Sequence, residues 1–274
     1  MTAAGIALAI ASSVAIGGGY ALQQATASRL PPLSPRRPVH SMALLVRSGR
    51  WTVGFLAGIG GWALYVVALT LAPLSLVQAA SAGGIGVLAL GGGRLRTAER
   101  VGVFAALGGL VLLGLSIASH GSTSRGSAAA VALWVGASLA LGVIAAWVRP
   151  SAPGLGTAAG VLYAAGDVAT KAAVVGGARL AFVPVLLACH GLAFVCLQLA
   201  FQRGGKLASA GLAVLWTNAL PIAAGMALFS ERLPGGTRGG LRIAAFVLVL
   251  GGAVALGRRG PEVGRPMEPV PLTD

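Results

Sequence analysis

Long apolar stretches fill most of this chain, and polar or basic residues are concentrated in the short gaps between them. A helix needs roughly 20 mostly apolar residues to cross the ~30 Å hydrocarbon core of a bilayer. Nine stretches have about that length. They cover about 3–24, 51–72, 74–92, 101–119, 128–148, 155–175, 179–201, 207–230 and 241–257. The pattern predicts an all-α polytopic membrane protein with about nine transmembrane helices.

The composition agrees with this prediction. Of the 274 residues, 56% are hydrophobic and only 9% are charged, whereas a soluble domain has about 25% charged residues. The 43 glycines would weaken helices in water. In lipid, small residues let helix backbones approach closely.

The net charge of +14 is spread over the connectors. A nucleic-acid interface needs clustered basic residues, so we expect no nucleic-acid partner. With nine spans, the connectors alternate between the two sides of the membrane. One side carries most of the basic residues, namely Arg29, Arg36, Arg37, Arg47, Arg50, Arg94, Arg96, Arg100, Arg149, Arg203, Lys206, Arg258, Arg259 and Arg265. The other side carries Arg125, Arg179, Arg232, Arg238 and Arg242. Basic residues favour the cytoplasm, which places the N-terminus outside and the C-terminus inside a bacterial inner (plasma) membrane.

The two halves of the chain resemble each other weakly. Residues 19–26 of the first span (GYALQQAT) match 166–172 of the sixth (GDVATKA), and Arg-Leu pairs follow the third and eighth spans. Spans one to four, about 3–119, therefore match spans six to nine, about 155–257, and 128–148 is a bridging helix. Matching spans are five apart, an odd number, so the copies have opposite orientations. Such inverted repeats are typical of secondary transporters. The alternative is that two Ala/Leu/Gly-rich halves look alike by composition alone.

Two segments fall outside the predicted bundle. Residues 26–50 combine prolines with five arginines and are expected to form a basic cytoplasmic loop. Within this loop, 40–46 is either a short interfacial helix or the remnant of a lost span. Residues 258–274 are proline-rich and lack apolar periodicity, which predicts a disordered cytoplasmic tail.

Three short sequences occur in this chain in an order and with a spacing that resemble those of a known family. They are 71–78 (LAPLSLVQ), Ala200-Phe201 before the eighth span, and 229–233 (FSERL) before a Gly-rich last helix. Together they resemble the drug/metabolite transporter (DMT) superfamily, which contains the EamA-like permeases. The nine-span count and the long first loop look most like the actinobacterial branch related to NIPA-type magnesium transporters. The resemblance covers nearly the whole chain and implies transport of a small solute. The chain departs from the family's usual ten-span layout.

Asp167 and Lys171 are the charged residues that lie deep inside a predicted span. Ionisable residues at this depth are functional candidates by default. Their spacing of four places both side chains on one helix face, where they can pair. One hypothesis is that Asp167 takes a proton or cation while Lys171 tunes the pKa of Asp167 or holds an anionic group. The other is a self-neutralising structural pair. Tyr163 extends the same stripe.

Further candidates come from other spans. Gln23 and Gln24 occupy the part of the first span that matches the Asp167 region, and we expect them to face the same cavity. Pro221 removes the hydrogen bond to the carbonyl of Thr217, which predicts a polar notch with Asn218 at mid-depth, or else a simple packing kink. Gln78 and Tyr65 are possible cavity residues, and His190 is either a proton relay or a hydrogen-bonded structural residue.

No enzyme motif, cofactor loop or metal-ligand cluster is visible in the sequence. We therefore expect a secondary transporter, not an enzyme, that moves a small metabolite or drug-like solute by alternating access, with protons as a candidate coupling ion. Its expected binding site contains Asp167, Lys171, Asn218, Gln78, Thr217, Tyr163, Gln24 and His190. A magnesium or other divalent-cation transporter ranks second, because one Asp beside a Lys is a poor Mg²⁺ site. A non-transporting integral membrane protein is the third possibility.

Overall fold

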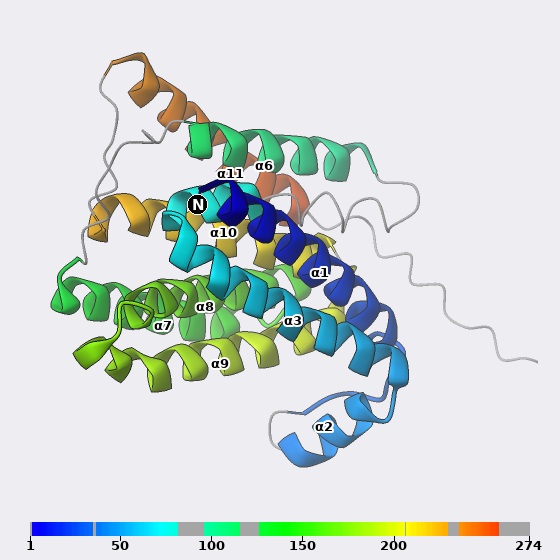
Figure 1. Cartoon of the computed structure of the whole chain (residues 1–274). Helices are drawn as coiled ribbons and strands as arrows, with labels where there is room; N and C mark the ends of the chain where they lie inside the picture. The colour runs from blue at the N-terminus through cyan, green and yellow to red at the C-terminus, as the bar shows by residue number, and fades with distance from the viewer. Residues whose placement is uncertain are drawn as a thin grey trace, which may run out of the picture.

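The computed structural model describes residues 2–34, 37–81, 96–115, 126–205, 207–229 and 236–257. All regular secondary structure in these ranges is helical (Figure 1). The long helices are α1 (Thr2–Ala27), α3 (Gly49–Leu71), α6 (Thr97–Leu115), α7 (Ala128–Val148), α8 (Ala152–Ala173), α9 (Phe182–Arg203), α10 (Leu212–Leu228) and α11 (Thr237–Gly257). The short ones are α2 (Pro38–Val46), α4 (Leu74–Ser81), the 3-10 helix η1 (Gly177–Ala181) and the π-helix η2 (Leu207–Gly211).

Five helical segments are long and apolar enough to cross a membrane. They are Ala3–Ala27, Gly49–Leu71, Ala128–Val148, Gly177–Arg203 and Leu207–Leu228. The all-α prediction is confirmed for the described residues, and these segments indicate a membrane protein. The count of nine spans and the inverted repeat stay predictions. Residues 82–92 and 116–119 of two predicted spans, and the predicted tail 258–274, lie outside the described residues.

Serine side chains define where several helices begin. The hydroxyl of Ser48 accepts a hydrogen bond from the backbone N–H of Trp51, and Ser127 and Ser151 do the same for Ala130 and Gly154. Such caps satisfy N–H groups that have no partner inside the helix. The basic connector contains helix α2, which has nine residues and is too short to cross a bilayer. Figure 1 shows α2 beside the end of the bundle where α1 ends and α3 begins.

The helices associate in pairs. α1 packs on α3, α8 packs on α9, α10 and α7, α4 packs on α10, and α6 packs on α11. Figure 1 shows α6 and α11 along one edge of the bundle and α7, α8 and α9 along the opposite edge. α8 is the central helix of the second half, since most of its residues are buried.

Glycines permit the closest helix contacts. A Cβ atom on Gly19 would lie 2.5 Å from the carbonyl oxygen of Gly54, where α1 crosses α3. On α8, a Cβ on Gly156 would lie 2.5 Å from the Ser209 carbonyl oxygen, and one on Gly160 would lie 2.7 Å from that of Ala213. Gly156 and Gly160 are four residues apart, so they form the small-xxx-small arrangement by which helices approach in lipid.

The outer surface of the bundle is apolar. On α7, Leu133 and Leu141 are exposed, and Trp147 keeps 85% of its surface accessible. Exposed apolar side chains also occur along α1, α3 and α9. Soluble proteins rarely expose so much continuous apolar surface. The exposed faces therefore suit contact with lipid, whereas polar residues such as Gln23, Asp167 and Asn218 are buried.

Candidate functional site

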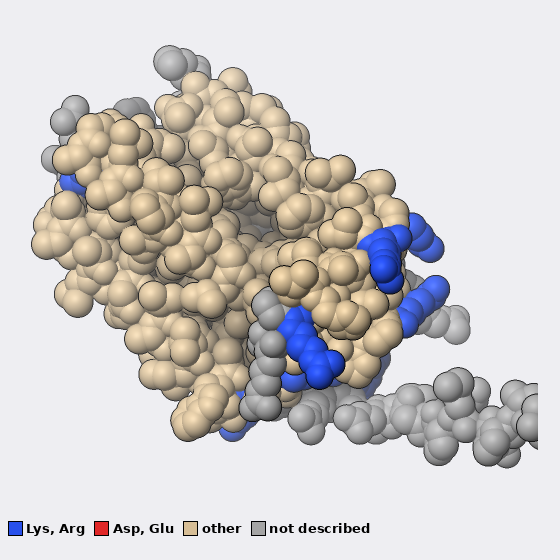
Figure 2. Space-filling view, turned by 90° about the horizontal axis from the view of Figure 1, so that it is seen from below, with Lys and Arg blue, Asp and Glu red and all other residues tan. Residues whose placement is uncertain are grey.

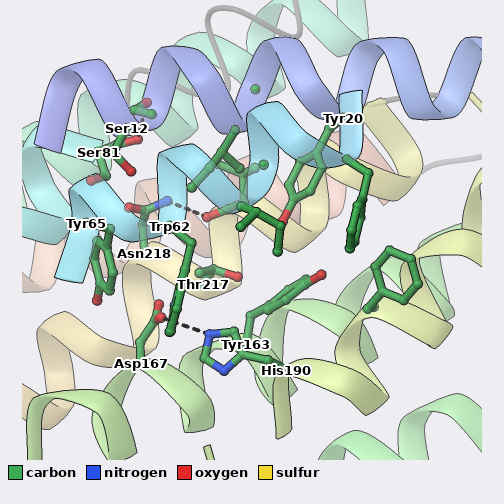
Figure 3. Close-up of a pocket in the computed structure, with 18 of the residues that line it drawn as sticks. Ser12, Tyr20, Trp62, Tyr65, Ser81, Tyr163, Asp167, His190, Thr217 and Asn218 are labelled. Carbon is green, nitrogen blue, oxygen red and sulfur yellow. Dashed lines mark hydrogen bonds and ion pairs between the residues drawn. The ribbon is translucent and has the colours of Figure 1, made fainter. Parts of the chain in front are cut away.

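A cavity of about 430 Å³ lies inside the bundle. Its walls come from α1, α2, α3 and α4 in the first half of the chain and from α8, α9 and α10 in the second (Figure 3). Most of the lining is apolar or aromatic, with a few polar groups. This composition is typical of small-molecule sites. The polar residues of the lining include Gln23, Gln78, Asp167, His190, Thr217 and Asn218.

Asp167 is the acidic residue among the lining residues of the cavity, and it is buried. Its Oδ2 atom accepts a hydrogen bond from Nε2 of Gln78 at 3.0 Å. Its Oδ1 atom lies 3.6 Å from Nε2 of His190. Nε2 of Gln78 also donates to the hydroxyl of Tyr65 at 2.6 Å. These contacts join α8, α4, α9 and α3 around one carboxyl group.

The environment of His190 determines which of its ring nitrogens carries a proton. Nδ1 lies 2.8 Å from the carbonyl oxygen of Leu186. A carbonyl oxygen only accepts, so Nδ1 is the donor in this hydrogen bond. Nε2 then faces a carboxyl oxygen of Asp167. Two acceptors facing each other would repel, so we infer that one proton lies between Nε2 and Oδ1, on the imidazole or on the carboxyl group.

Lys171 has hydrogen-bond partners at the end of α3, and its predicted pairing with Asp167 stays a prediction. Nζ of Lys171 donates to the carbonyl oxygens of Leu69 at 2.9 Å and Ala72 at 3.4 Å. In a continuous helix, the N–H of residue 73 would satisfy the Leu69 carbonyl, but Pro73 has no N–H. The last carbonyls of a helix also attract cations. Lys171 therefore caps the C-terminal end of α3 and is not part of the cavity lining.

The polar notch predicted around Pro221 faces the cavity. Pro221 lies inside α10, and Thr217 and Asn218 line the cavity one turn earlier. The hydroxyl of Thr217 donates to the carbonyl oxygen of Gly160 at 3.4 Å, which links α10 to α8. Nδ2 of Asn218 donates to the Val214 carbonyl oxygen at 2.7 Å. Oδ1 of Asn218 is buried without a hydrogen-bond partner among the described residues.

Of the two neighbouring glutamines of α1, only Gln23 lines the cavity. Its Oε1 accepts from Gln198 at 2.7 Å, and its Nε2 donates to the Gly54 carbonyl oxygen at 3.2 Å. Gln24 instead donates to the carbonyl oxygen of Gly204 at 3.5 Å. The expectation that Gln24 faces the cavity is therefore wrong. Successive helix residues point about 100° apart, and Gln24 lies on the side of α1 that faces Gly204.

The cavity is also lined by four aromatic residues that the sequence analysis did not single out, Tyr20, Phe55, Trp62 and Phe194. The ring of His190 lies between Trp62 at 5.7 Å and Tyr163 at 5.6 Å, measured between ring centroids. Figure 3 shows Tyr20 of α1 approaching Tyr163 across the cavity. Phe55 and Phe194 meet at 5.6 Å. On α3, the lining residues Phe55, Ile59, Trp62 and Tyr65 recur every three or four positions, a helical stripe that the sequence already contained.

The comparisons with known proteins do not identify the chain. No family model, no curated protein and no solved structure matches it. The resemblance to the DMT superfamily therefore stays a prediction. Within the described ranges, no group of three or more His, Cys, Asp or Glu side chains could hold a metal ion.

Proposed function

We propose that this protein is a secondary transporter of the DMT type, which moves a small metabolite or drug-like solute across the bacterial inner membrane by alternating access. The observation that carries the proposal is the cavity between the two halves of the chain. It contains the buried Asp167 together with His190, Gln78 and Asn218. Ionisable residues inside a membrane bundle are costly, and they mark substrate or ion pathways.

The helix pairs support a nine-span architecture with two inverted repeats. If α1, α3, α4 and α6 correspond to α8, α9, α10 and α11, then α1 packs on α3 as α8 packs on α9. The remaining helices pair across the repeats, α4 with α10 and α6 with α11. α7 is then the bridging helix. In this proposal the N-terminus is outside and the C-terminus is cytoplasmic, and the halves rock around the cavity.

The Asp167–His190 pair supports proton coupling. One proton held between Nε2 and Oδ1 can leave when a substrate group takes the place of either partner. Asp167→Asn keeps an acceptor for Gln78 but removes the titrating carboxyl group. We expect this variant to lose the pH dependence of transport; transport with unchanged pH dependence would exclude coupling through Asp167.

A divalent-cation transporter is the second candidate function. Mg²⁺ is bound by oxygen ligands, usually including one or two carboxylates. In the described part of the chain, Asp167 is the cavity carboxylate, and its neighbour is an imidazole that can carry a positive charge. This arrangement favours an organic solute over Mg²⁺. A non-transporting membrane protein is less favoured, because several polar side chains converge on the cavity.

Accessibility of the cavity from the two sides of the membrane tests transport without knowledge of the substrate. Thr217→Cys places a thiol in the lining, in a background with Cys189→Ala and Cys196→Ala. A membrane-impermeant maleimide is applied to right-side-out and to inverted vesicles. Alternating access requires labelling from both sides. The matched control is Ser138→Cys, a buried position on α7 outside the lining, which should stay unlabelled. Labelling of Thr217→Cys from one side or from neither would contradict the proposal.

A further inference from the structure

We propose that the cavity opens sideways between α3 and α9 into the bilayer, and that its substrate is an amphiphile that enters from the lipid. The polar head group would lie near Asp167 and Asn218, and the apolar chain would extend through the gap between the two helices. This inference rests on the proposed transport function and specifies its substrate class and its entry route.

The lining residues themselves reach the outer surface. Ile59 on α3 is 50% exposed and Leu187 on α9 is 59% exposed, yet both line the cavity. Gly191, which also lines the cavity, is exposed, and a Cβ atom placed on it would have nothing within 4 Å. Gly58 on α3 is a second lining residue without a side chain. The wall between α3 and α9 is therefore incomplete at its middle.

The mouth of this opening faces an apolar surface. Figure 2, which views the molecule from below, shows a hollow in a tan surface, with most of the Lys and Arg side chains at one end. Around Ile59 and Leu187, the exposed side chains of α3 and α9 include Leu56, Leu192 and Val195. Such a surface contacts acyl chains in a membrane, so in the described conformation an opening within it leads to lipid.

Contacts between α1, α3 and α9 narrow the cavity near the start of α3. Nε1 of Trp51 donates to Gln198 at 3.0 Å, and Gln198 donates in turn to Gln23. The ring of Trp51 stacks on Phe55 at 5.2 Å, and Phe194 packs edge-on against both rings. These side chains narrow the cavity toward this end of the bundle, where Met42 of α2 is an exposed lining residue. The gap between α3 and α9 is the open side that Ile59, Leu187 and Gly191 indicate.

Unsatisfied polar atoms inside the cavity indicate which hydrogen-bonding groups the head group of the substrate carries. Oγ of Ser12, Nε1 of Trp62 and Oδ1 of Asn218 are buried without a hydrogen-bond partner in the described part of the chain, and all three residues line the cavity. Together with the carboxyl group of Asp167, they offer both donors and acceptors (Figure 3). Buried polar groups are normally satisfied. A head group that donates and accepts hydrogen bonds, such as an ethanolamine, would satisfy them.

Tryptophan fluorescence in vesicles with brominated acyl chains tests the lateral opening, because bromine quenches only a tryptophan that the chains touch. Trp62 is kept as the sole tryptophan by replacing Trp51, Trp134, Trp147 and Trp216 with Phe. A sole-Trp147 variant gives the quenching of a lipid-facing ring, and a sole-Trp51 variant that of a buried ring, which is 1% exposed. We expect brominated lipid to quench Trp62 nearly as strongly as Trp147.

Filling the gap should remove this quenching. Gly191→Leu places a side chain in the opening, where its Cβ would meet nothing within 4 Å, and we expect most of the Trp62 quenching to be lost. Gly136→Leu is the matched control, because Gly136 is also exposed and also has nothing within 4 Å of its Cβ position, but lies on α7. If the Phe replacements prevent folding, the same comparison is made with all five tryptophans present, where only Gly191→Leu should lower the total quenching.

The substrate class is tested with two probes that share a head group. N-dodecylethanolamine should relieve the quenching of Trp62 by brominated lipid, and ethanolamine at the same concentration should not. If both probes relieve the quenching of Trp62 equally, the proposal that the substrate is an amphiphile is excluded. If acrylamide in the water quenches Trp62 and brominated lipid does not, the cavity is reached from water and the lateral opening is wrong. Absence of quenching by either agent would also overturn it. The maleimide labelling of Thr217→Cys would still decide the transport function independently.

Discussion

Nε2 of His190 lies 3.6 Å from Oδ1 of Asp167, and the two residues reach the same cavity from α9 and α8. The side chain of Asp167 is almost fully buried, whereas that of His190 keeps 18% of its surface accessible. A buried carboxylate is unfavourable unless a partner neutralises it or it is protonated. His190 therefore stabilises the buried carboxyl group of Asp167.

Removal of His190 should destabilise the protein more when Asp167 is present than when it is absent. His190→Leu leaves the buried carboxyl group without its partner, which costs about 1–3 kcal/mol. In the Asp167→Asn background the same change should cost clearly less, because an amide carries no charge. Thermal unfolding in detergent, followed for the two single variants and the double variant, measures the coupling. Losses that simply add would show that the two side chains do not interact.

Lys171 should stabilise the C-terminal end of α3 and should have no effect on the titration of Asp167. Lys171→Met leaves the carbonyl oxygen of Leu69 without this donor, and we expect a loss of about 1–3 kcal/mol. Lys171→Arg keeps the donors and should lose much less. The measurement is again thermal unfolding, combined with the pH profile of transport. A shifted pH profile in Lys171→Met at normal stability would instead support the hypothesis that Lys171 tunes Asp167.

The position of the His190 ring depends on a glycine of the neighbouring helix. A Cβ atom on Gly166 would overlap Nδ1 and Cε1 of His190. Gly166→Ala should push the ring away from Asp167 and cost about 1–3 kcal/mol, as overpacking usually does. Gly191→Ala, one residue from His190 but facing open space, should be nearly neutral. His190→Ala should rescue the unfolding temperature of Gly166→Ala; if it does not, the cost of Gly166→Ala arises elsewhere.

The two adjacent glutamines of α1 should differ in importance. Gln23→Leu breaks two buried hydrogen bonds, those with Gln198 and with Gly54, and leaves their partners unsatisfied. This predicts a loss of about 1–3 kcal/mol or more. Gln24→Leu removes one longer, partly buried contact with Gly204 and should change stability by about 0.5 kcal/mol or less. Equal losses of unfolding temperature in the two variants would contradict the assignment of Gln23 to the interior.

Helix positions could be read from the sequence because the signals that set them are local. The predicted segment 128–148 coincides with α7, whose first turn is capped by the Ser127 hydroxyl. The break between α3 and α4 falls at Ala72-Pro73, since Pro73 cannot continue the hydrogen bonding of α3. Residues 40–46 lie in the short helix α2, whose nine residues are too few to cross a bilayer; an interfacial helix and the remnant of a lost span both stay predictions.

The polar members of the site could also be named in advance. A polar residue in an apolar helix avoids lipid and turns toward the interior, so Asp167, His190, Gln78 and Asn218 converge on one cavity. Their partners could not be named, because partners depend on which helices pack together and with what rotation. The spacing of four residues made Lys171 the apparent partner of Asp167. The packing of α8 against the end of α3 gave Lys171 carbonyl oxygens as partners.

By itself, the sequence determined the helical class, the approximate helix positions, the apolar exterior and the identity of most polar interior residues, because these follow from hydrophobicity and from local hydrogen bonding. Only the tertiary structure decided that Asp167 pairs with His190, that Gln23 and not Gln24 faces inward, and that the cavity is left open between α3 and α9. These features depend on the rotation and separation of helices distant in the chain. Close contacts such as Gly166 against His190 set that rotation and separation, and no local pattern encodes them.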